Sequence, residues 1–397
     1  METAPNASKY KLNIYKFYIF SFILGIHTVR GVYIPYMMEW GGLTFFQIMI
    51  LQSYFTAMIV ILEIPSGAIA DFLGRKVALA LSAFSIASAA FTYSIIPNFF
   101  MFMLAETLWA FGSALSSGTS DAFVYFSLKS FNNERNLSNT LGRSRTLNLI
   151  ALTISAPIGS IIAQFISLQF AMTSLVFIYI GAFSVALTFK EPKFTNNNYK
   201  EESYWKIIIS GFKELKKNKI LRVLAIDWIP INTLIFFLFW TYQIYLNAIN
   251  VPIFVFGFIL SVMNIVNAIF SMLIPILLKK SSNKKIFLLL INIINGVAYI
   301  SLGLTTIIPL GIAIILTIVA FGYTRYLIFV DGINLQIESE NRATVLSTIN
   351  MFGSLIRALI YPFVGLLVEW SVFAVFIVIG ALILILTIFT RSKSEYL

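Results

Sequence analysis

The sequence predicts an all-α membrane protein with twelve transmembrane helices. Three observations support this fold class. The chain of 397 residues is 59% hydrophobic and only 11% charged, long apolar runs recur from end to end, and basic residues occupy alternate connections between these runs. A soluble protein of this size would carry roughly a quarter charged residues. The runs do not alternate between apolar and polar positions, which argues against a transmembrane β-barrel.

Each apolar run is long enough to cross a bilayer as a helix, which requires about 20 apolar residues. Twelve such runs occur, at residues 14–37, 44–70, 77–96, 99–120, 141–166, 170–189, 220–246, 252–278, 286–307, 309–329, 343–367 and 372–389. No small-residue cleavage site accompanies the first run, so we interpret it as a retained span rather than a signal peptide.

The net charge of +11 is distributed in a pattern that indicates topology. Lys and Arg lie in the N-terminal segment, the alternate connections, the middle loop and the tail, whereas the intervening connections hold Glu39 and Glu369 but no basic residue. This pattern obeys the positive-inside rule, so we expect a multi-pass protein of the cell membrane with both termini in the cytoplasm. The basic excess then contacts lipid headgroups of the bilayer rather than nucleic acid.

The chain contains no cysteine and one histidine. This composition excludes disulfides and a metal site built from His and Cys, and we expect no cofactor.

One connection is much longer than the others and divides the chain. It begins with the polar stretch "KEPKFTNNNYKEES" and continues as "YWKIIISGFKELKKNK", which places apolar residues and lysines on opposite sides of a helix. We therefore expect an N-terminal six-helix bundle (1–189), a cytoplasmic linker with an amphipathic helix on the membrane surface (190–219) and a C-terminal six-helix bundle (220–397). The alternative for the linker is a solvated tether.

The two halves resemble each other. A Gly-Arg-Lys sequence at 74–76 follows the second span and Asn-Lys-Lys at 283–285 follows the eighth, while the fifth and eleventh spans each carry a proline shortly before a glycine. A duplicated six-helix unit is typical of secondary transporters, whose substrate site lies between the halves near the membrane centre.

The stretch "GAIADFLGRK" between the second and third spans contains Gly67, Asp71, Gly74, Arg75 and Lys76. It is similar to the G-x-x-x-D-x-x-G-[RK]-[RK] signature between helices 2 and 3 of the major facilitator superfamily. Together with the twelve spans and the central loop, the resemblance covers essentially the whole chain. It implies two six-helix bundles related by a pseudo-twofold axis, which move by alternating access.

The resemblance also implies a conformational latch on the cytoplasmic side. Gly67 permits close helix approach and Gly74 a tight turn. Asp71 is expected to cap the eleventh helix, near residue 342, because a helix N-terminus favours an anion. Arg75 is expected to pair with Asp121 at the end of helix 4. In the alternative interpretation, the basic residues at 75 and 76 only anchor the loop by their charge.

Two further motifs of drug antiporters are degraded. Helix 4 carries Glu106 where those proteins carry an arginine, and the helix 5 motif survives only as "SAPIGS". These departures count against a drug/proton antiporter.

Ionisable residues inside apolar spans are costly, so each is a candidate functional residue. Those in this sequence are His27, Arg30, Glu63, Glu106, Asp227, Arg325 and Arg357. The third, sixth, ninth and twelfth spans contain none, and the resemblance places those four helices on the lipid-facing outside.

Depth along the helices suggests an ion pair between Arg30 and Glu106, since each lies about 10 Å below the outer surface at 1.5 Å per residue. The pair has either a transport role or a static one. Glu63 and Glu106 are the first candidates to carry a coupling proton, and Asp227 is the third, unless it pairs with Arg222.

Polar and aromatic residues at helical spacing complete the predicted substrate cavity. Gln52, Thr56 and Glu63 share a face of helix 2. The remaining members of the predicted cavity are Trp109, Asn232, Phe236, Gln243, Asn350 and Tyr361.

These features predict a proton-coupled secondary transporter of a small organic solute, acting as a monomer. The aromatic interior, including Phe236 and Trp109, favours an antiporter for multidrug efflux of amphipathic compounds. The alternative is a symporter that takes up an organic anion or metabolite, which the three intramembrane arginines favour. An enzyme or a sensor is a remote alternative, because the sequence has no metal, nucleophile or phosphate-binding constellation and no connection long enough for a soluble domain.

Overall fold

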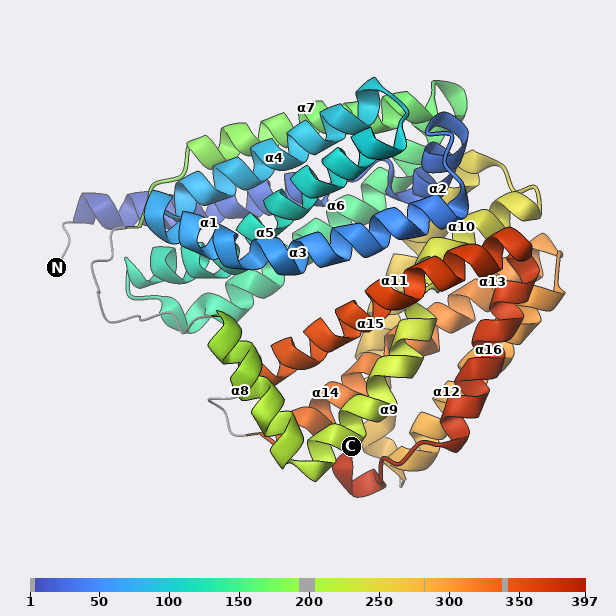
Figure 1. Ribbon diagram of the computed structural model, residues 1–397. Coiled ribbons are helices and arrows are strands. Elements are labelled where there is room, and N and C mark those ends of the chain that lie inside the picture. Colours follow the sequence, from blue (N-terminus) through green and yellow to red (C-terminus); the bar gives the residue numbers. More distant parts are fainter. Residues whose placement is uncertain (1–3, 193–203, 282, 338–341) are drawn as a thin grey trace. The chain divides into compact units, whose positions relative to one another are not determined.

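The computed structural model describes residues 4–192, 204–281, 283–337 and 342–397, and in these segments the chain is almost entirely helical (Figure 1). The helices are α1 (Ala4–Gly25), η1 (Arg30–Val32), α2 (Tyr33–Pro35), η2 (Tyr36–Trp40), α3 (Phe45–Leu73), α4 (Arg75–Ile95), α5 (Phe99–Lys129), η3 (Glu134–Asn136), α6 (Leu137–Phe165), α7 (Leu168–Leu187), α8 (Tyr204–Lys217), α9 (Lys219–Phe236), α10 (Leu238–Ala248), α11 (Ile253–Lys280), α12 (Lys284–Leu304), α13 (Ile308–Ile318), η4 (Val319–Tyr323), α14 (Arg325–Leu335), α15 (Arg342–Trp370), α16 (Val372–Ile388) and η5 (Ser394–Tyr396).

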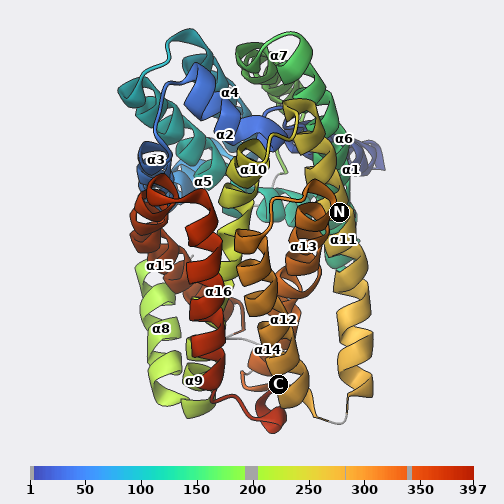
Figure 2. The same cartoon turned by 90° about the vertical axis from the view of Figure 1, so that its right-hand side faces the viewer.

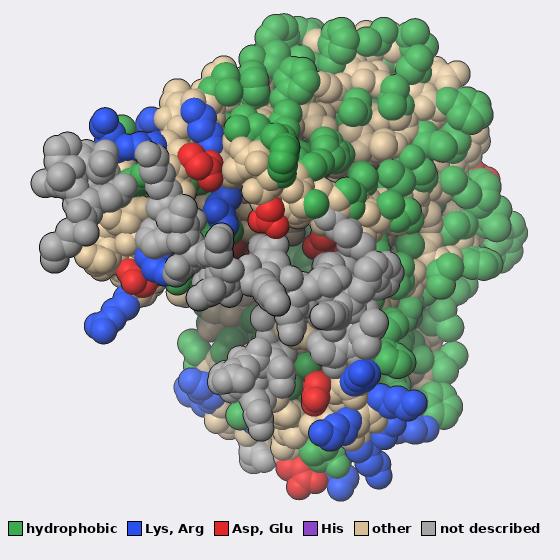
Figure 3. Space-filling view, turned by 60° about the vertical axis from the view of Figure 1, so that its left-hand side comes forward, with side chains coloured by type: hydrophobic (Ala, Val, Ile, Leu, Met, Phe, Trp, Pro, Cys, Tyr) green, Lys and Arg blue, Asp and Glu red, His purple; other side chains and the backbone are tan. Residues whose placement is uncertain are grey.

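The spans predicted from the sequence are confirmed. Within the described segments, eleven helical stretches are long and apolar enough to cross a membrane, and α16 is a shorter apolar helix of 17 residues. Each coincides with one of the twelve apolar runs. Figure 3 shows broad hydrophobic surfaces, with most of the visible Lys and Arg side chains gathered away from them. This surface suits helices that face lipid.

The chain forms two compact units. The N-terminal unit comprises Met1–Leu43, Leu51–Lys200 and Ile253–Ser261, and the C-terminal unit comprises Thr44–Ile50, Glu201–Pro252 and Val262–Leu397. The start of α3 thus belongs to the C-terminal unit and the start of α11 to the N-terminal unit.

Small residues bring the helices of the N-terminal unit close together. Helix α4 lies between α5 and α7 (Figure 1). A methyl group added at Gly112 of α5 would lie 2.6 Å from Cγ1 of Ile86, and the Ser82 hydroxyl donates a 2.6 Å hydrogen bond to the Gly112 carbonyl. Close backbone approach through small residues, with a hydroxyl bonded across the interface, is how membrane helices pack without a hydrophobic driving force.

The same principle operates in the C-terminal unit, where α12 lies beside α16 (Figure 2). A methyl group at Gly380 would lie 2.6 Å from the Gly296 carbonyl oxygen, so the two glycines allow the backbones to touch.

Helix α8 of the linker belongs to the C-terminal unit. It packs against α15, with Leu215 buried and the rings of Phe212 and Phe352 6.0 Å apart. A methyl group at Gly211 would overlap Thr348 of α15. The side of α8 that carries Leu215 therefore faces α15, and the place of this helix on the membrane surface stays a prediction. The side chains of Tyr204, Ile207 and Ile208 lie outside that set.

Three of the spans are interrupted. The first leaves helical geometry at residues 26–29, the seventh breaks at Phe237 between α9 and α10, and the tenth contains the π-helical turn η4. In the first break, the Ser155 hydroxyl accepts from the His27 amide at 2.9 Å, and the Thr28 hydroxyl donates to the Ala171 carbonyl at 2.7 Å. Irregular backbone at membrane depth needs such partners and commonly marks a binding site.

The turn between α3 and α4 depends on a glycine. Gly74 has φ +87° and ψ 159°, a conformation that only glycine adopts readily. The Glu191 carboxylate accepts from the amides of Arg75 at 2.9 Å and Lys76 at 2.6 Å, and thereby caps α4. The tight turn predicted at Gly74 is confirmed, and the acid that caps α4 comes from the segment that follows α7.

Replacing Gly74 by alanine is expected to destabilise the protein by about 1–3 kcal/mol, because the backbone conformation excludes a side chain. An added methyl group would also lie 3.1 Å from the Glu191 carboxyl carbon. Thermal unfolding of the detergent-purified protein measures this effect. Gly67→Ala is the matched control: it lies inside α3 with no described atom within 4 Å of the added methyl, so it should be neutral or slightly stabilising. Equal behaviour of the two variants would contradict the prediction.

Candidate functional site

A buried carboxyl group lies at the centre of a hydrogen-bond network in the N-terminal unit. Glu106 of α5 is 4% exposed. Its Oε1 accepts from the Tyr33 hydroxyl at 3.0 Å and from the Gln52 amide at 2.9 Å. The Tyr33 and Tyr93 hydroxyls are 3.3 Å apart. The network joins α2, α3, α4 and α5, and the donors that bond the carboxyl group are uncharged.

An aromatic cluster lies one turn along α5. The rings of His27 and Trp109 are 5.3 Å apart, and Trp109 meets Tyr179 edge-on at 5.7 Å. The Tyr179 hydroxyl donates to the Ile26 carbonyl at 3.2 Å, in the break of the first span. The break therefore places His27, predicted from the sequence as a cavity residue, beside α5.

Two predictions for this region need correction. The ion pair expected between Arg30 and Glu106 is not formed; Arg30 begins η1, and Tyr33 and Gln52 bond the glutamate instead. Glu63 is half-buried on α3, eleven residues beyond Gln52, or about 16 Å along the helix. The structure thus separates the two carboxylates that the sequence ranked first.

Tyr33 and Tyr93 were missed by the sequence analysis. Neither belongs to a polar stripe, because each is a single phenol within an apolar run. A search for tyrosines at the depth of Glu106 would have found both.

A small pocket lies in the C-terminal unit between α9 and α15. Its lining includes Asn232 of α9 and Asn350 and Arg357 of α15, all of which the sequence placed in the cavity. The Arg357 guanidinium donates to the Ser354 hydroxyl at 2.7 Å and lies 5.0 Å from the Phe236 ring centroid. The structure therefore brings together four predicted site residues in one unit.

Gln243 and Tyr361 do not line this pocket. Gln243 is buried and donates to the Tyr242 hydroxyl at 3.1 Å, while Tyr361 accepts from the Trp240 indole at 3.2 Å. Both side chains take part in packing within the C-terminal unit.

Arg325 is a core residue rather than part of a cavity wall. It is 0% exposed and donates from Nε to Asn292 Oδ1 at 2.8 Å, from Nη1 to the Trp228 carbonyl at 3.2 Å and from Nη2 to the Asp227 carbonyl at 2.7 Å. Pro230 in α9 has no amide hydrogen, so a backbone carbonyl one turn earlier in that helix lacks its usual hydrogen-bond donor. Arg325 supplies donors to the carbonyls of that turn.

Asp227 likewise has a structural partner, and it is not Arg222. Its Oδ2 accepts from the amides of Arg391 at 2.9 Å and Ser392 at 2.6 Å and from the Ser392 hydroxyl at 2.6 Å. Ser392 is fully buried. The carboxylate therefore holds the segment after α16 against α9.

Replacing Asp227 by asparagine is expected to release this segment, because hydrogen bonds to a charged acceptor are stronger than those to a neutral one by about 1–2 kcal/mol. Hydrogen–deuterium exchange of the peptide covering residues 390–397 should accelerate about tenfold or more. The control is Glu395→Gln, which removes an exposed ion pair with Lys393 (3.4 Å) in the same segment. Unchanged exchange in the Asp227 variant would contradict the assignment.

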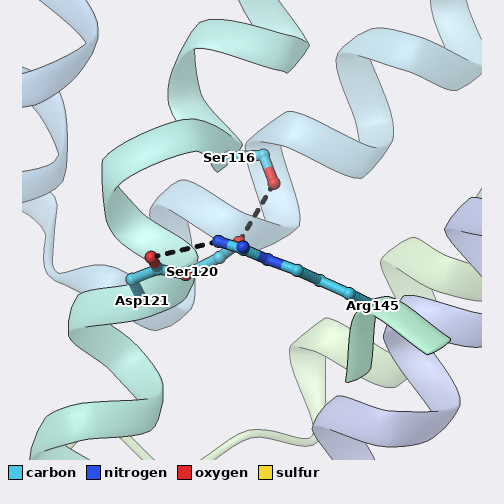
Figure 4. Close-up of polar contacts among 4 residues, drawn as sticks. All are labelled: Ser116, Ser120, Asp121 and Arg145. Carbon is cyan, nitrogen blue, oxygen red and sulfur yellow. Dashed lines mark hydrogen bonds and ion pairs between the residues drawn. The ribbon is translucent and has the colours of Figure 1, made fainter. Parts of the chain in front are cut away.

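The latch residues are arranged differently from the prediction, and Figure 4 shows Asp121 beside Arg145. Asp121 pairs with Arg145 at 3.9 Å, not with Arg75, whose guanidinium lies 4.1 Å from the Phe126 ring centroid. Gly67 is exposed, and no close helix approach occurs there among the described residues. Asp71 lies exposed in the last turn of α3, and its capping role stays a prediction because residue 342 belongs to the other unit. Lys76 contributes its amide to the bond with Glu191.

Comparisons with known proteins agree with this architecture. The sequence model of the Major Facilitator Superfamily matches residues 17–359. No curated protein sequence gives a significant match. Among solved structures, the chain is similar to the nucleoside transporter NupG (TM-score 0.78, 15% identity, covering 96% of this chain and 100% of that one). It is also similar to a bacterial homologue of the human lysosomal transporter Spinster (0.73, 14%, 100% and 97%) and to a D-xylose–proton symporter (0.70, 12%, 98% and 99%).

At these identities the structural likeness shows the fold. The family model spans most of the chain, including the signature between α3 and α4 and both units. The chain belongs to the Major Facilitator Superfamily.

Proposed function

We propose that this protein is a proton-coupled secondary transporter that takes up a small polar organic solute by alternating access. The observation that carries the proposal is the Glu106 network. It is a buried carboxyl group bonded by uncharged donors, next to a break in the first span.

A carboxyl group held in this way suits proton coupling. Its bonds come from Tyr33 and Gln52, which can donate to the oxygen whether or not the carboxyl group carries a proton. No ion pair has to break when the proton leaves. Loss of the proton would leave a charge in an apolar bundle, and a change in access to water would relieve that cost.

Uptake is favoured over drug efflux by the site chemistry. Helix α5 carries a carboxyl group where drug antiporters carry an arginine, and the pocket at Arg357 is lined by amide and cationic side chains. The similar structures are those of proteins named as a nucleoside transporter and a D-xylose–proton symporter, which supports a polar solute. Efflux of amphipathic compounds is the second candidate. The stacked rings of Phe236 and Phe239, 6.2 Å apart and next to Trp240, favour it.

We further propose that the transporter acts as a monomer in the cell membrane, with both termini in the cytoplasm. The distribution of Lys and Arg among the connections supports this orientation.

Transport into proteoliposomes tests the proposal. Radiolabelled nucleosides, sugars and organic acids would be supplied with and without an imposed pH gradient, acid outside. At one proton per solute, a gradient of one pH unit should support about tenfold accumulation. Accumulation that follows the gradient supports symport, whereas accumulation only under the reversed gradient indicates antiport. Equilibration that ignores the gradient in every case would refute proton coupling.

A further inference from the structure

The pocket between α9 and α15 contains polar groups that the protein itself does not satisfy. The Trp228 indole Nε1 and the Thr233 hydroxyl have no hydrogen-bond partner in the described part of the chain. The two side chains are 3% and 1% exposed, and both line the pocket. Buried polar groups are almost always paired, so two unpaired groups at one pocket indicate a missing partner.

The same pocket contains a positive charge without a carboxylate partner. Within the described segments Arg357 makes one hydrogen bond, to Ser354, and it lies near the face of Phe236. A guanidinium offers five N–H donors, so most of its hydrogen-bonding capacity remains. No acidic side chain of the described segments forms an ion pair with it. Burial of an uncompensated cation is costly, and a bound anion would offset that cost.

The size of the pocket limits what it can hold. Its cavity volume is about 20 Å³. Pockets that enclose a whole small-molecule ligand are larger, about 300–1,000 Å³. The pocket therefore suits one terminal group, with the rest of the ligand outside. A planar guanidinium matches a carboxylate by two parallel hydrogen bonds.

We propose that this pocket binds the carboxylate group of the transported solute, with Arg357 as its counter-ion and Trp228 and Thr233 as neutral donors. The amides of Asn232 and Asn350 complete the lining. This inference rests on the proposed function, because it makes the solute of that transporter a monocarboxylate. One proton carried with one carboxylate is then an electroneutral transport step.

Matched ligand pairs test the subsite without a transport assay. The probes are benzoate with benzamide, nicotinate with nicotinamide, and indole-3-acetate with indole-3-acetamide. Each acid and its amide have nearly the same shape and differ in charge. At about ten times its dissociation constant, a bound acid should raise the unfolding temperature of the purified protein by about 2 °C, and its amide should not.

Two substitutions locate the effect. Arg357→Gln should weaken acid binding about 10–100-fold, since it removes charge-assisted hydrogen bonds. Thr233→Val should weaken binding about fivefold while leaving the unliganded protein as stable as before, because the hydroxyl that it removes has no partner. The controls are Arg145→Gln at an exposed position and Thr317→Val at a half-buried position outside the pocket, and they should retain wild-type binding.

Several results would overturn the proposal: equal stabilisation by acids and amides, no stabilisation by any acid, or unchanged acid binding in both pocket variants. The proton-coupling proposal fails separately. If the transported solute accumulates with the pH gradient but is neutral, and its accumulation also responds to an imposed membrane potential, only the carboxylate subsite is refuted. If the protein binds acids but does not accumulate solute with the pH gradient, only the proton-coupling proposal is refuted.

Discussion

Replacing Glu106 by glutamine is expected to abolish proton-driven accumulation while solute exchange continues. Glutamine keeps the oxygen that accepts from Tyr33 and Gln52, so the network and the fold should persist. It resembles the protonated carboxyl group permanently and has no proton to release. Exchange of one solute molecule for another does not require that release, whereas net uptake followed by return of the empty transporter does.

The size of the effect follows from the driving force. With a gradient of one pH unit, wild-type protein carrying one proton per solute should accumulate about tenfold, and the variant should only equilibrate. Accumulation and counterflow in proteoliposomes measure the two activities separately. Glu63→Gln is the comparison, because it removes the other carboxyl group predicted from the sequence. If Glu63→Gln loses accumulation and Glu106→Gln keeps it, the coupling role belongs to Glu63.

Replacing Arg325 by methionine is expected to cause the largest loss of stability. The guanidinium is fully buried and donates to Asn292 and to two carbonyls of α9, which would all lose a partner inside a dry core. Removing one member of a buried charged network costs about 3–5 kcal/mol. The unfolding temperature should fall by about 4–6 °C.

The measurement is the fraction of monodisperse protein that remains after heating in detergent. Arg145→Met is the control because this arginine is 76% exposed and forms one surface ion pair, which contributes about 0–1 kcal/mol. Arg325→Lys should be intermediate, since an ammonium group cannot reach three acceptors in a fork. If Arg325→Met were as stable as Arg145→Met, the arginine would instead be a functional group tolerated in the core.

The fold could be predicted from the sequence because its signals are local. Apolar runs, basic connections and the signature that ends at Lys76 each depend on a short stretch, and the structure has a helix at every predicted span. The break at His27 carries no such signal. It depends on Ser155 of α6 and Ala171 of α7, which are distant in the sequence.

The roles of the charged residues were harder to predict, because the position of a residue along its span does not reveal which group its side chain contacts. Arg325 and Asp227 met the same criterion as Glu106, an ionisable group inside an apolar span. The Arg325 guanidinium donates to backbone carbonyls, and the Asp227 carboxylate accepts from Ser392. Neither partner can be predicted from the sequence alone. Arg357 could be assigned to the cavity from the sequence, because it lies on a polar face of its helix. The unpaired groups of Trp228 and Thr233 became visible only when the surrounding side chains were in place.

The docked segment after α16 has a practical consequence for anyone who purifies the protein. Leu397 is 1% exposed and its carbonyl accepts from Lys284, while a methyl group at Gly332 would overlap Tyr396. A fluorescent or affinity fusion attached directly there would have to emerge from an enclosed position and would compete with the anchoring at Ser392.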